Sequence, residues 1–160
     1  MNSEDKFDRS SRHSKITGDF GEKLVLYWLS KHGYECAFVD HVGIDIIAWD
    51  KGKKRRLGIS VKARSRLEKT KGTSLDFNRT HIEKLENACE DFDCEPYFAL
   101  VIDEGDSVFV FILKSSQLQE QCNPNTKNIS WKMGEKYLKK YKEIEGVKII
   151  QLRAETRSWS

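Results

Sequence analysis

The alternation of apolar and polar residues divides the chain into helical and extended segments. Apolar residues recur at helical spacing over 17–32, where Gly33 marks the end of the helix, and over 80–92, where Thr80-His-Ile-Glu83 predicts a capping box. Short apolar or alternating runs predict strands. These strands span 35–40, 44–49, 57–63, 97–102 and 107–113, with an edge strand at 147–153. A short helix near 116–121 and a basic helix at 135–144 complete the pattern.

This order of elements predicts an α/β fold, with a mixed sheet of about five strands flanked by helices. A chain of 160 residues with 38% apolar content is long enough for one domain with one sizeable core. We therefore expect a flexible N-terminal arm over 1–16 and a single domain over 17–160. That domain would have its core at 17–113 and a C-terminal decoration at 114–160, and we expect a polar loop at 65–77.

Several classes of protein are excluded by composition. No apolar run approaches the roughly 20 residues of a membrane span, so no membrane partner is expected. The N-terminal stretch is polar and lacks the apolar centre of a signal peptide. The four cysteines show neither a Cys-x-x-Cys motif nor zinc-ligand spacing with histidine, so they are interpreted as reduced thiols. Together these features predict a cytoplasmic protein.

Positive charge is concentrated in the middle of the chain. Between residues 51 and 71 there are ten basic residues and one acid, whereas the whole chain has a net charge of +3. Such a stretch is typical of a surface that binds a polyanion, because neutralising phosphates drives nucleic-acid affinity. The alternative is a solvated hairpin and loop that only maintain solubility. The candidate nucleic-acid-binding residues are Lys53, Lys54, Arg55, Arg56, Arg64, Arg66, Lys69 and Lys71.

Three charged residues stand in apolar surroundings. Glu22 lies between Leu26 and Leu29 on the first helix, where it is either functional or simply an acid near the positive end of the helix dipole. Asp45 interrupts an apolar strand, where it is either buried and paired or exposed on an edge strand. Lys62 can lie beside Asp45 if their strands pair as a hairpin. Such a pair is either a structural ion pair or part of a site for metal-assisted phosphodiester hydrolysis.

Taken in order, these motifs resemble the core of the PD-(D/E)xK nuclease superfamily. The resemblance spans about 17–113 and is nearest to the branch that includes archaeal Holliday-junction resolvases. It rests on a glycine-rich helix start with Glu22, a Gly-x-Asp strand with Asp45, and a strand ending Lys62-Ala-Arg. It implies a restriction-endonuclease-like fold and Mg²⁺- or Mn²⁺-dependent hydrolysis of DNA. In that scheme Asp45 is the principal metal ligand, Lys62 activates water and stabilises charge, and Glu22 positions water or a second ion.

Ser60 departs from the pattern, because the family carries an acid two residues before the lysine. A neutral hydroxyl in that catalytic position weakens Mg²⁺ binding. Either a later acid replaces the missing carboxylate, or Glu22 and Asp45 suffice with water, or the site is inactive. The candidate replacements are Asp76 in a loop and Glu83 or Glu86 on the second helix. Of these, Glu83 is also explained by the capping box, and Asp76 as an ordinary loop acid.

The resulting expectation is a metal-dependent endonuclease that hydrolyses DNA phosphodiester bonds, with RNA as a second candidate substrate. The alternative is a catalytically lapsed nuclease fold that binds nucleic acid or protein. A homodimer is left open.

His81 shares the apolar sector of the second helix with Leu85 and Ala88, and we interpret it as an interior histidine, although it could also point into the same cleft. Arg64 and Arg66 would hold a phosphate backbone, or be exposed at the strand end.

Overall fold

A computed structural model of the chain describes residues 9–66, 70 and 72–158. Lys69 and Lys71 lie outside these residues, so their expected contact with nucleic acid is not addressed. The helices are α1 (His13–Lys31), α2 (Thr80–Phe92), α3 (Ser115–Glu120) and α4 (Glu135–Lys142). The strands are β1 (Glu35–His41), β2 (Ile44–Asp50), β3 (Arg55–Arg66), β4 (Leu75–Asn78), β5 (Glu95–Glu104), β6 (Ser107–Lys114), β7 (Asn128–Trp131) and β8 (Lys148–Arg153).

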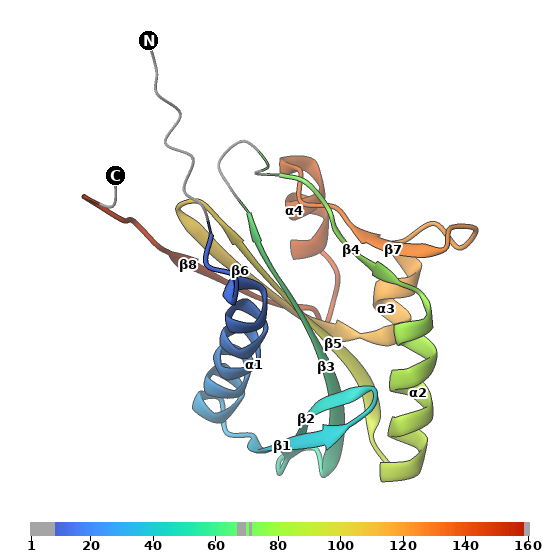
Figure 1. The fold of residues 1–160 in the computed structure, drawn as a ribbon. Helices are drawn as coiled ribbons and strands as arrows, with labels where there is room; N and C mark the ends of the chain where they lie inside the picture. Colours follow the sequence, from blue (N-terminus) through green and yellow to red (C-terminus); the bar gives the residue numbers. More distant parts are fainter. Residues whose placement is uncertain (1–8, 67–69, 71, 159–160) are drawn as a thin grey trace.

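The centre of the molecule is a six-stranded mixed sheet in the order β1-β2-β3-β5-β6-β8 (Figure 1). Neighbouring strands are antiparallel except β3 and β5, which run parallel from Leu57 beside Glu95 to Arg66 beside Glu104. A parallel pair needs a long crossover, and the chain between β3 and β5 supplies it through β4 and α2. The expectation of an α/β fold with helices flanking a mixed sheet is therefore confirmed, with one strand more than expected.

Helices and a small second sheet cover the two faces of the main sheet. On one face α1 packs Val25 and Leu29 against apolar residues of β2, β3, β5 and β6. On the other face lie α2, α3 and the β4–β7 pair (Figure 1). Because both faces are covered, β5 is buried along nearly its whole length, and its sequence reads as a continuous apolar run.

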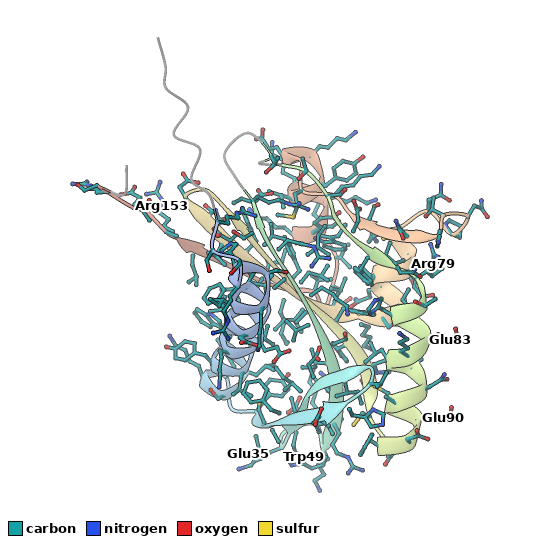
Figure 2. The ribbon with its side chains drawn as sticks, in the orientation of Figure 1. Glu35, Trp49, Arg79, Glu83, Glu90 and Arg153 are labelled. Carbon is teal, nitrogen blue, oxygen red and sulfur yellow. The ribbon has the colours of Figure 1, made fainter. Side chains whose placement is uncertain are left out.

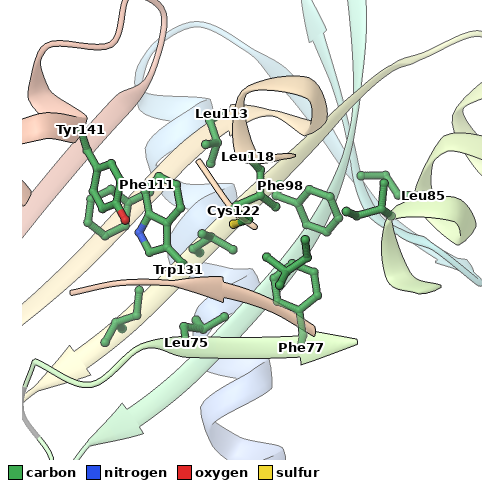
Figure 3. Close-up of a cluster of buried hydrophobic side chains, with 14 of the residues drawn as sticks. Leu75, Phe77, Leu85, Phe98, Phe111, Leu113, Leu118, Cys122, Trp131 and Tyr141 are labelled. Atoms are coloured by element: carbon green, nitrogen blue, oxygen red, sulfur yellow. The ribbon is translucent and has the colours of Figure 1, made fainter. Parts of the chain in front are cut away.

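The core on the α2 face is rich in aromatic rings (Figure 3). Trp131 of β7 is completely buried and stacks on Tyr141 of α4, with ring centroids 3.7 Å apart. Phe111 packs edge-on against both rings. Phe77 of β4 packs against Phe98 of β5, with ring centroids 5.3 Å apart. The segment after β6 thus contributes directly to the core beside the site described below.

Several local predictions are wrong. The first helix starts at His13, so residues 13–16 of the expected arm are helical, and Arg12 at its N-cap makes no side-chain capping bond that could mark the start. The second helix has Arg79 at its N-cap, and the Thr80 amide donates to the side chain of Asn78 at 2.9 Å, so Thr80 and Glu83 form no capping box. The expected loop at 65–77 contains the end of β3 and most of β4, and β7 was not expected. Among the residues described, no helix combines the length and apolar character of a membrane span.

Candidate active site

Asp45 sits where β2 separates from β3. The ladder between these strands runs from Asp50 beside Arg55 to Ile46 beside Ile59 and goes no further. At the next step an Asp45 carboxylate oxygen accepts a hydrogen bond from the Val61 main-chain N–H at 2.7 Å, in place of a strand-to-strand bond. The carboxylate is therefore fixed at the fork between the two strands, with its other oxygen still able to accept or coordinate.

Lys62 follows Val61 and points to the opposite face, toward α2. Its ammonium lies 2.9 Å from Nδ1 of His81 on α2 and 5.7 Å from the centre of the Phe77 ring. Burial lowers the pKa of Lys62, with Arg64 and Lys84 acting in the same direction and the carboxylate of Asp45 opposing them. Ser60, two residues earlier on the same face, is buried with 4% of its surface exposed.

Glu22 reaches the same place from α1. Gly21 lets the helix approach β3 so closely that a Cβ at this position would lie 2.7 Å from the Cβ of Ala63. Glu22, the next residue, is half-buried. Burial raises the pKa of its carboxyl group, and the carboxylate of Asp45 raises it further. Two like charges repel one another, so the electrostatic influence of Asp45 on Glu22 is consistent with both carboxylates facing the same region between α1 and the β2–β3 fork.

An open cleft adjoins this cluster. It has a volume of about 470 Å³ and lies between the N-terminal turns of α1 and the half of β3 that β2 leaves uncovered. Lys62 and Arg64 line it from β3, and the Arg9 guanidinium donates to the Ser65 carbonyl at its rim. Among the residues that the structure describes, its lining contains basic and hydroxyl side chains and no acid. Such a lining suits a polyanion next to the Asp45–Lys62 pair.

The structure does not gather the acids that were expected to complete a metal site. Within the described ranges, no three histidine, cysteine, aspartate or glutamate side chains are close enough to hold an ion together, so Asp45, Asp76 and Glu86 do not form one ligand set. The Glu86 carboxylate accepts hydrogen bonds from Ser115 and Gln119, both at 3.2 Å, at α3.

Asp76 and Glu83 are also directed elsewhere. Asp76 is exposed on β4, where alternation turns it away from its buried neighbours Leu75 and Phe77 and hence from Lys62. Glu83 lies on the outer side of α2 (Figure 2). Of the residues predicted for the site, Ser60 and Lys62 share one face of β3 and Asp45 lies at the fork between β2 and β3. The charge of Asp45 acts on both Lys62 and Glu22.

The basic residues do not form one continuous surface. Arg55 precedes Lys62 by seven residues on β3, about 23 Å along an extended strand. Lys53 and Lys54 are exposed at that distant β2–β3 turn. Arg55 pairs with Asp50 and Glu95, both at 3.5 Å.

Two more arginines are also engaged within the protein. Arg56 pairs with Asp93 at 3.0 Å. Arg66 donates to the Ser74 carbonyl and so fastens the chain after β3 to the start of β4. Arg64 donates to the main-chain carbonyls of Ala63 and Asp76, and it differs from Arg55, Arg56 and Arg66 in lining the cleft beside Lys62.

Sequence reasoning missed two contributors to the site. The Val61 amide carries no side-chain signal, and the contact of Asp45 with it depends on where β2 leaves the sheet. Arg9 falls in the segment that was expected to be a flexible arm. For His81 both an interior position and a position in the cleft were considered, and the structure shows it half-buried and in contact with Lys62.

The order of strands, the fork that holds Asp45 and the helix that carries Glu22 together define a restriction-endonuclease-like fold. A comparison with solved structures agrees. The chain is similar to the structure of Hjc, a Holliday junction resolvase from the archaeal hyperthermophile Archaeoglobus fulgidus. The two share 24% sequence identity over 75% of this chain and 85% of that chain, with a TM-score of 0.54. No protein-family model and no curated protein matches the chain.

Proposed function

We propose that this protein is a metal-dependent endonuclease that hydrolyses DNA phosphodiester bonds. The observation that supports the proposal is the position of Asp45 at the fork between β2 and β3, where its charge acts on both Glu22 of α1 and half-buried Lys62 of β3. The fold shared with a Holliday junction resolvase supports the same conclusion. An acidic pair beside a lysine at the mouth of a basic cleft is suited to phosphoryl transfer, in which positioning and charge stabilisation supply most of the catalysis.

Each side chain has a distinct part in this proposal. Asp45, held by the Val61 amide, keeps a fixed negative charge at the fork. Lys62 places a positive charge where negative charge develops on the phosphate oxygens, and its partial burial strengthens that interaction. Glu22, whose pKa is raised by burial and by Asp45, is suited to accept a proton from the attacking water.

The donor set is compatible with Mg²⁺ or Mn²⁺. Magnesium usually takes one or two carboxylates from the protein and completes its shell with water and substrate phosphate, so a third protein acid is not required. Asp45 would hold the ion directly and Glu22 would hold it through a bound water, and the ion would supply Lewis-acid polarisation of the phosphate. Repulsion between these two carboxylates, the second cause of the raised pKa of Glu22, is what a cation would relieve.

The second candidate is a lapsed nuclease fold that binds nucleic acid without cutting it. The observation that favours it is Ser60, which is buried on the face of Lys62 and offers only a neutral hydroxyl. Both candidates share the cleft lined by Lys62 and Arg64, so both predict salt-sensitive DNA binding. Metal-dependent cleavage is what separates them.

The experiment that tests the proposal is a cleavage assay on labelled linear duplex, nicked duplex, four-way junction and single-stranded RNA, with Mg²⁺ or Mn²⁺. We expect cleavage of at least one DNA that requires the metal and is abolished in Asp45→Asn. In parallel, a thermal-shift titration with each metal is expected to raise the melting temperature of the wild type and not of Asp45→Asn. DNA binding with neither cleavage nor metal stabilisation would establish the lapsed module instead.

Oligomeric state and substrate shape are linked in this proposal. A four-way junction presents two equivalent strands, so paired incisions need two active sites related by symmetry. If the junction is the preferred substrate, we expect light scattering to detect two copies of the chain on each junction. Lys53 and Lys54, about 23 Å from Lys62, would meet the same duplex about seven base pairs from the cut at ~3.4 Å per pair.

A further inference from the structure

The Lys62–His81 contact is the feature of the site that the proposed mechanism has not used. The two side chains come from β3 and α2, nineteen residues apart, and meet with 2.9 Å between Nζ and Nδ1. Phe77 of β4 closes the third side, because the ammonium lies 5.7 Å from its ring centre and the imidazole packs edge-on against it at 6.0 Å. Three elements therefore fix the position of one ammonium group.

Chemistry decides which partner donates in this hydrogen bond. An unperturbed lysine holds its proton about four pKa units more tightly than an unperturbed histidine, so at neutral pH the ammonium donates and Nδ1 accepts. The remaining proton of the neutral ring must then reside on Nε2. The histidine is thus held in one tautomer by the lysine that it orients.

The surroundings of His81 favour its neutral form. Its pKa is lowered by burial first, then by Lys62, then by Lys84 on its own helix and Arg64 on β3. Asp45 on β2 acts in the opposite direction, and Phe77 on β4 is uncharged. Protonation would put a cationic N–H donor against a cationic N–H donor and break the contact.

We propose that His81 is a positioning residue that aims the Lys62 ammonium at the reacting phosphate, and that it does so only while the imidazole is neutral. The hydrogen bond that orients Lys62 is seen in the structure. Its effect on catalysis rests on the proposed nuclease function. It makes the enzyme sensitive to acid through a group that is not among its proposed metal ligands. Loss of the acceptor frees a long flexible side chain, and misplacing a catalytic group by about 1 Å costs up to about 100-fold in rate.

A test that does not depend on catalysis uses the other histidines as internal controls. Nδ1 of His32 lies 2.7 Å from the Trp28 carbonyl, and Nδ1 of His41 lies 2.8 Å from the Val42 carbonyl. A carbonyl only accepts, so these two rings carry their proton on Nδ1, the reverse of His81. Imidazole ¹⁵N spectra of uniformly labelled protein are therefore expected to show the Nε2–H tautomer for His81 and the Nδ1–H tautomer for His32 and His41.

The same spectra measure the coupling between the two side chains. Lys62→Met removes the charge and keeps the length of the side chain, so the pKa of His81 is expected to rise. An Nδ1–H tautomer for His81, or a pKa that does not respond to Lys62→Met, would overturn the proposal. Neither result depends on cleavage, so the inference can fail or stand separately from the proposed function.

Kinetics then test the consequence in the folded enzyme. His81→Gln retains an acceptor oxygen that cannot titrate near neutrality, whereas His81→Leu retains bulk without an acceptor. We expect His81→Leu to lower kcat by at least about 10-fold with little change in KM for DNA. His81→Gln should keep most of kcat at neutral pH and should lose the part of the acid decline, below about pH 6.5, that we expect protonation of His81 to cause in the wild type. Equal kcat in His81→Leu and the wild type, or an unchanged pH profile in His81→Gln, would contradict the positioning role.

Discussion

The close approach of α1 to β3 provides a sharp test of how the site is built. Gly21 is buried, and a Cβ added there would lie 2.7 Å from the Cβ of Ala63, with Val61 and Val101 at 3.6 and 3.7 Å. Carbon atoms pack best at about 3.5–4.0 Å, so Gly21→Ala forces the helix and strand apart by about 1 Å. Glu22 on one side of this contact and Lys62 on the other would move with them.

Gly18, one turn earlier on the same helix, is the matched control, because a Cβ there meets nothing within 4 Å. Both substitutions gain the helix propensity of alanine over glycine, about 1 kcal/mol. Only Gly21→Ala also incurs the cost of overpacking, about 1–3 kcal/mol. The two variants should therefore differ in the free energy of unfolding by about 1–3 kcal/mol, and Gly18→Ala alone should exceed the wild type.

The assay is urea denaturation, monitored by tryptophan fluorescence. The denaturation midpoints of the variants can be compared as stabilities if their m-values are equal. We expect the denaturation midpoint of Gly18→Ala to lie above that of the wild type and the midpoint of Gly21→Ala to lie clearly below that of Gly18→Ala. If the two variants were equally stable, α1 would not pack on Ala63, and the placement of Glu22 beside Asp45 would lose its support.

Three further predictions address the core and the titrating groups. Trp131→Ala removes a fully buried ring stacked on Tyr141, and we expect chemical denaturation to show a loss of about 3–5 kcal/mol, where a loss below 1 would refute the packing. Burial raises the pKa of the Cys89 thiol to about 12, so iodoacetamide at mildly alkaline pH should alkylate Cys94 before Cys89, as peptide mass spectrometry can show. Burial and Asp45 raise the pKa of Glu22 in the folded protein, so the folded state favours the protonated carboxyl group. The stability that Glu22 contributes is therefore complete below about pH 4.5 and is lost as the pH rises through its pKa in the folded state. Glu22→Gln should therefore raise the thermal midpoint at neutral pH but not in acid, and a lower midpoint at neutral pH would contradict this.

Much of the site could be predicted from the sequence because strand periodicity is local. Alternation along Ile59–Lys62 puts Ser60 and Lys62 on one face, and Asp45 stands out within an apolar strand. Both features depend only on neighbouring residues. The fold class followed for the same reason, since the order of helices and strands and the buried run of β5 are visible in the pattern.

What could not be predicted depends on where strands stop and which distant segments meet. The contact of Asp45 with the Val61 amide exists because the β2–β3 ladder ends at Ile46 and Ile59. The pairing of β4 with β7 joins residues more than fifty positions apart and places Phe77 beneath Lys62. Composition likewise could not show that Arg55 and Arg56 of the basic stretch are engaged in intramolecular ion pairs.

The most direct test of the central claim compares two lysine substitutions in one cleavage assay. Lys62→Met removes the charge proposed to act on the phosphate, and Lys53→Met removes an exposed charge about 23 Å away at the β2–β3 turn. In single-turnover cleavage with enzyme saturating the preferred DNA, a contact of Lys53 with the duplex no longer affects the rate. With saturating Mg²⁺ or Mn²⁺ the rate should fall by at least about 100-fold in Lys62→Met and by less than about 3-fold in Lys53→Met. Equal rates for Lys62→Met and the wild type, with the fold intact by circular dichroism, would show that the fork between β2 and β3 is not the catalytic site.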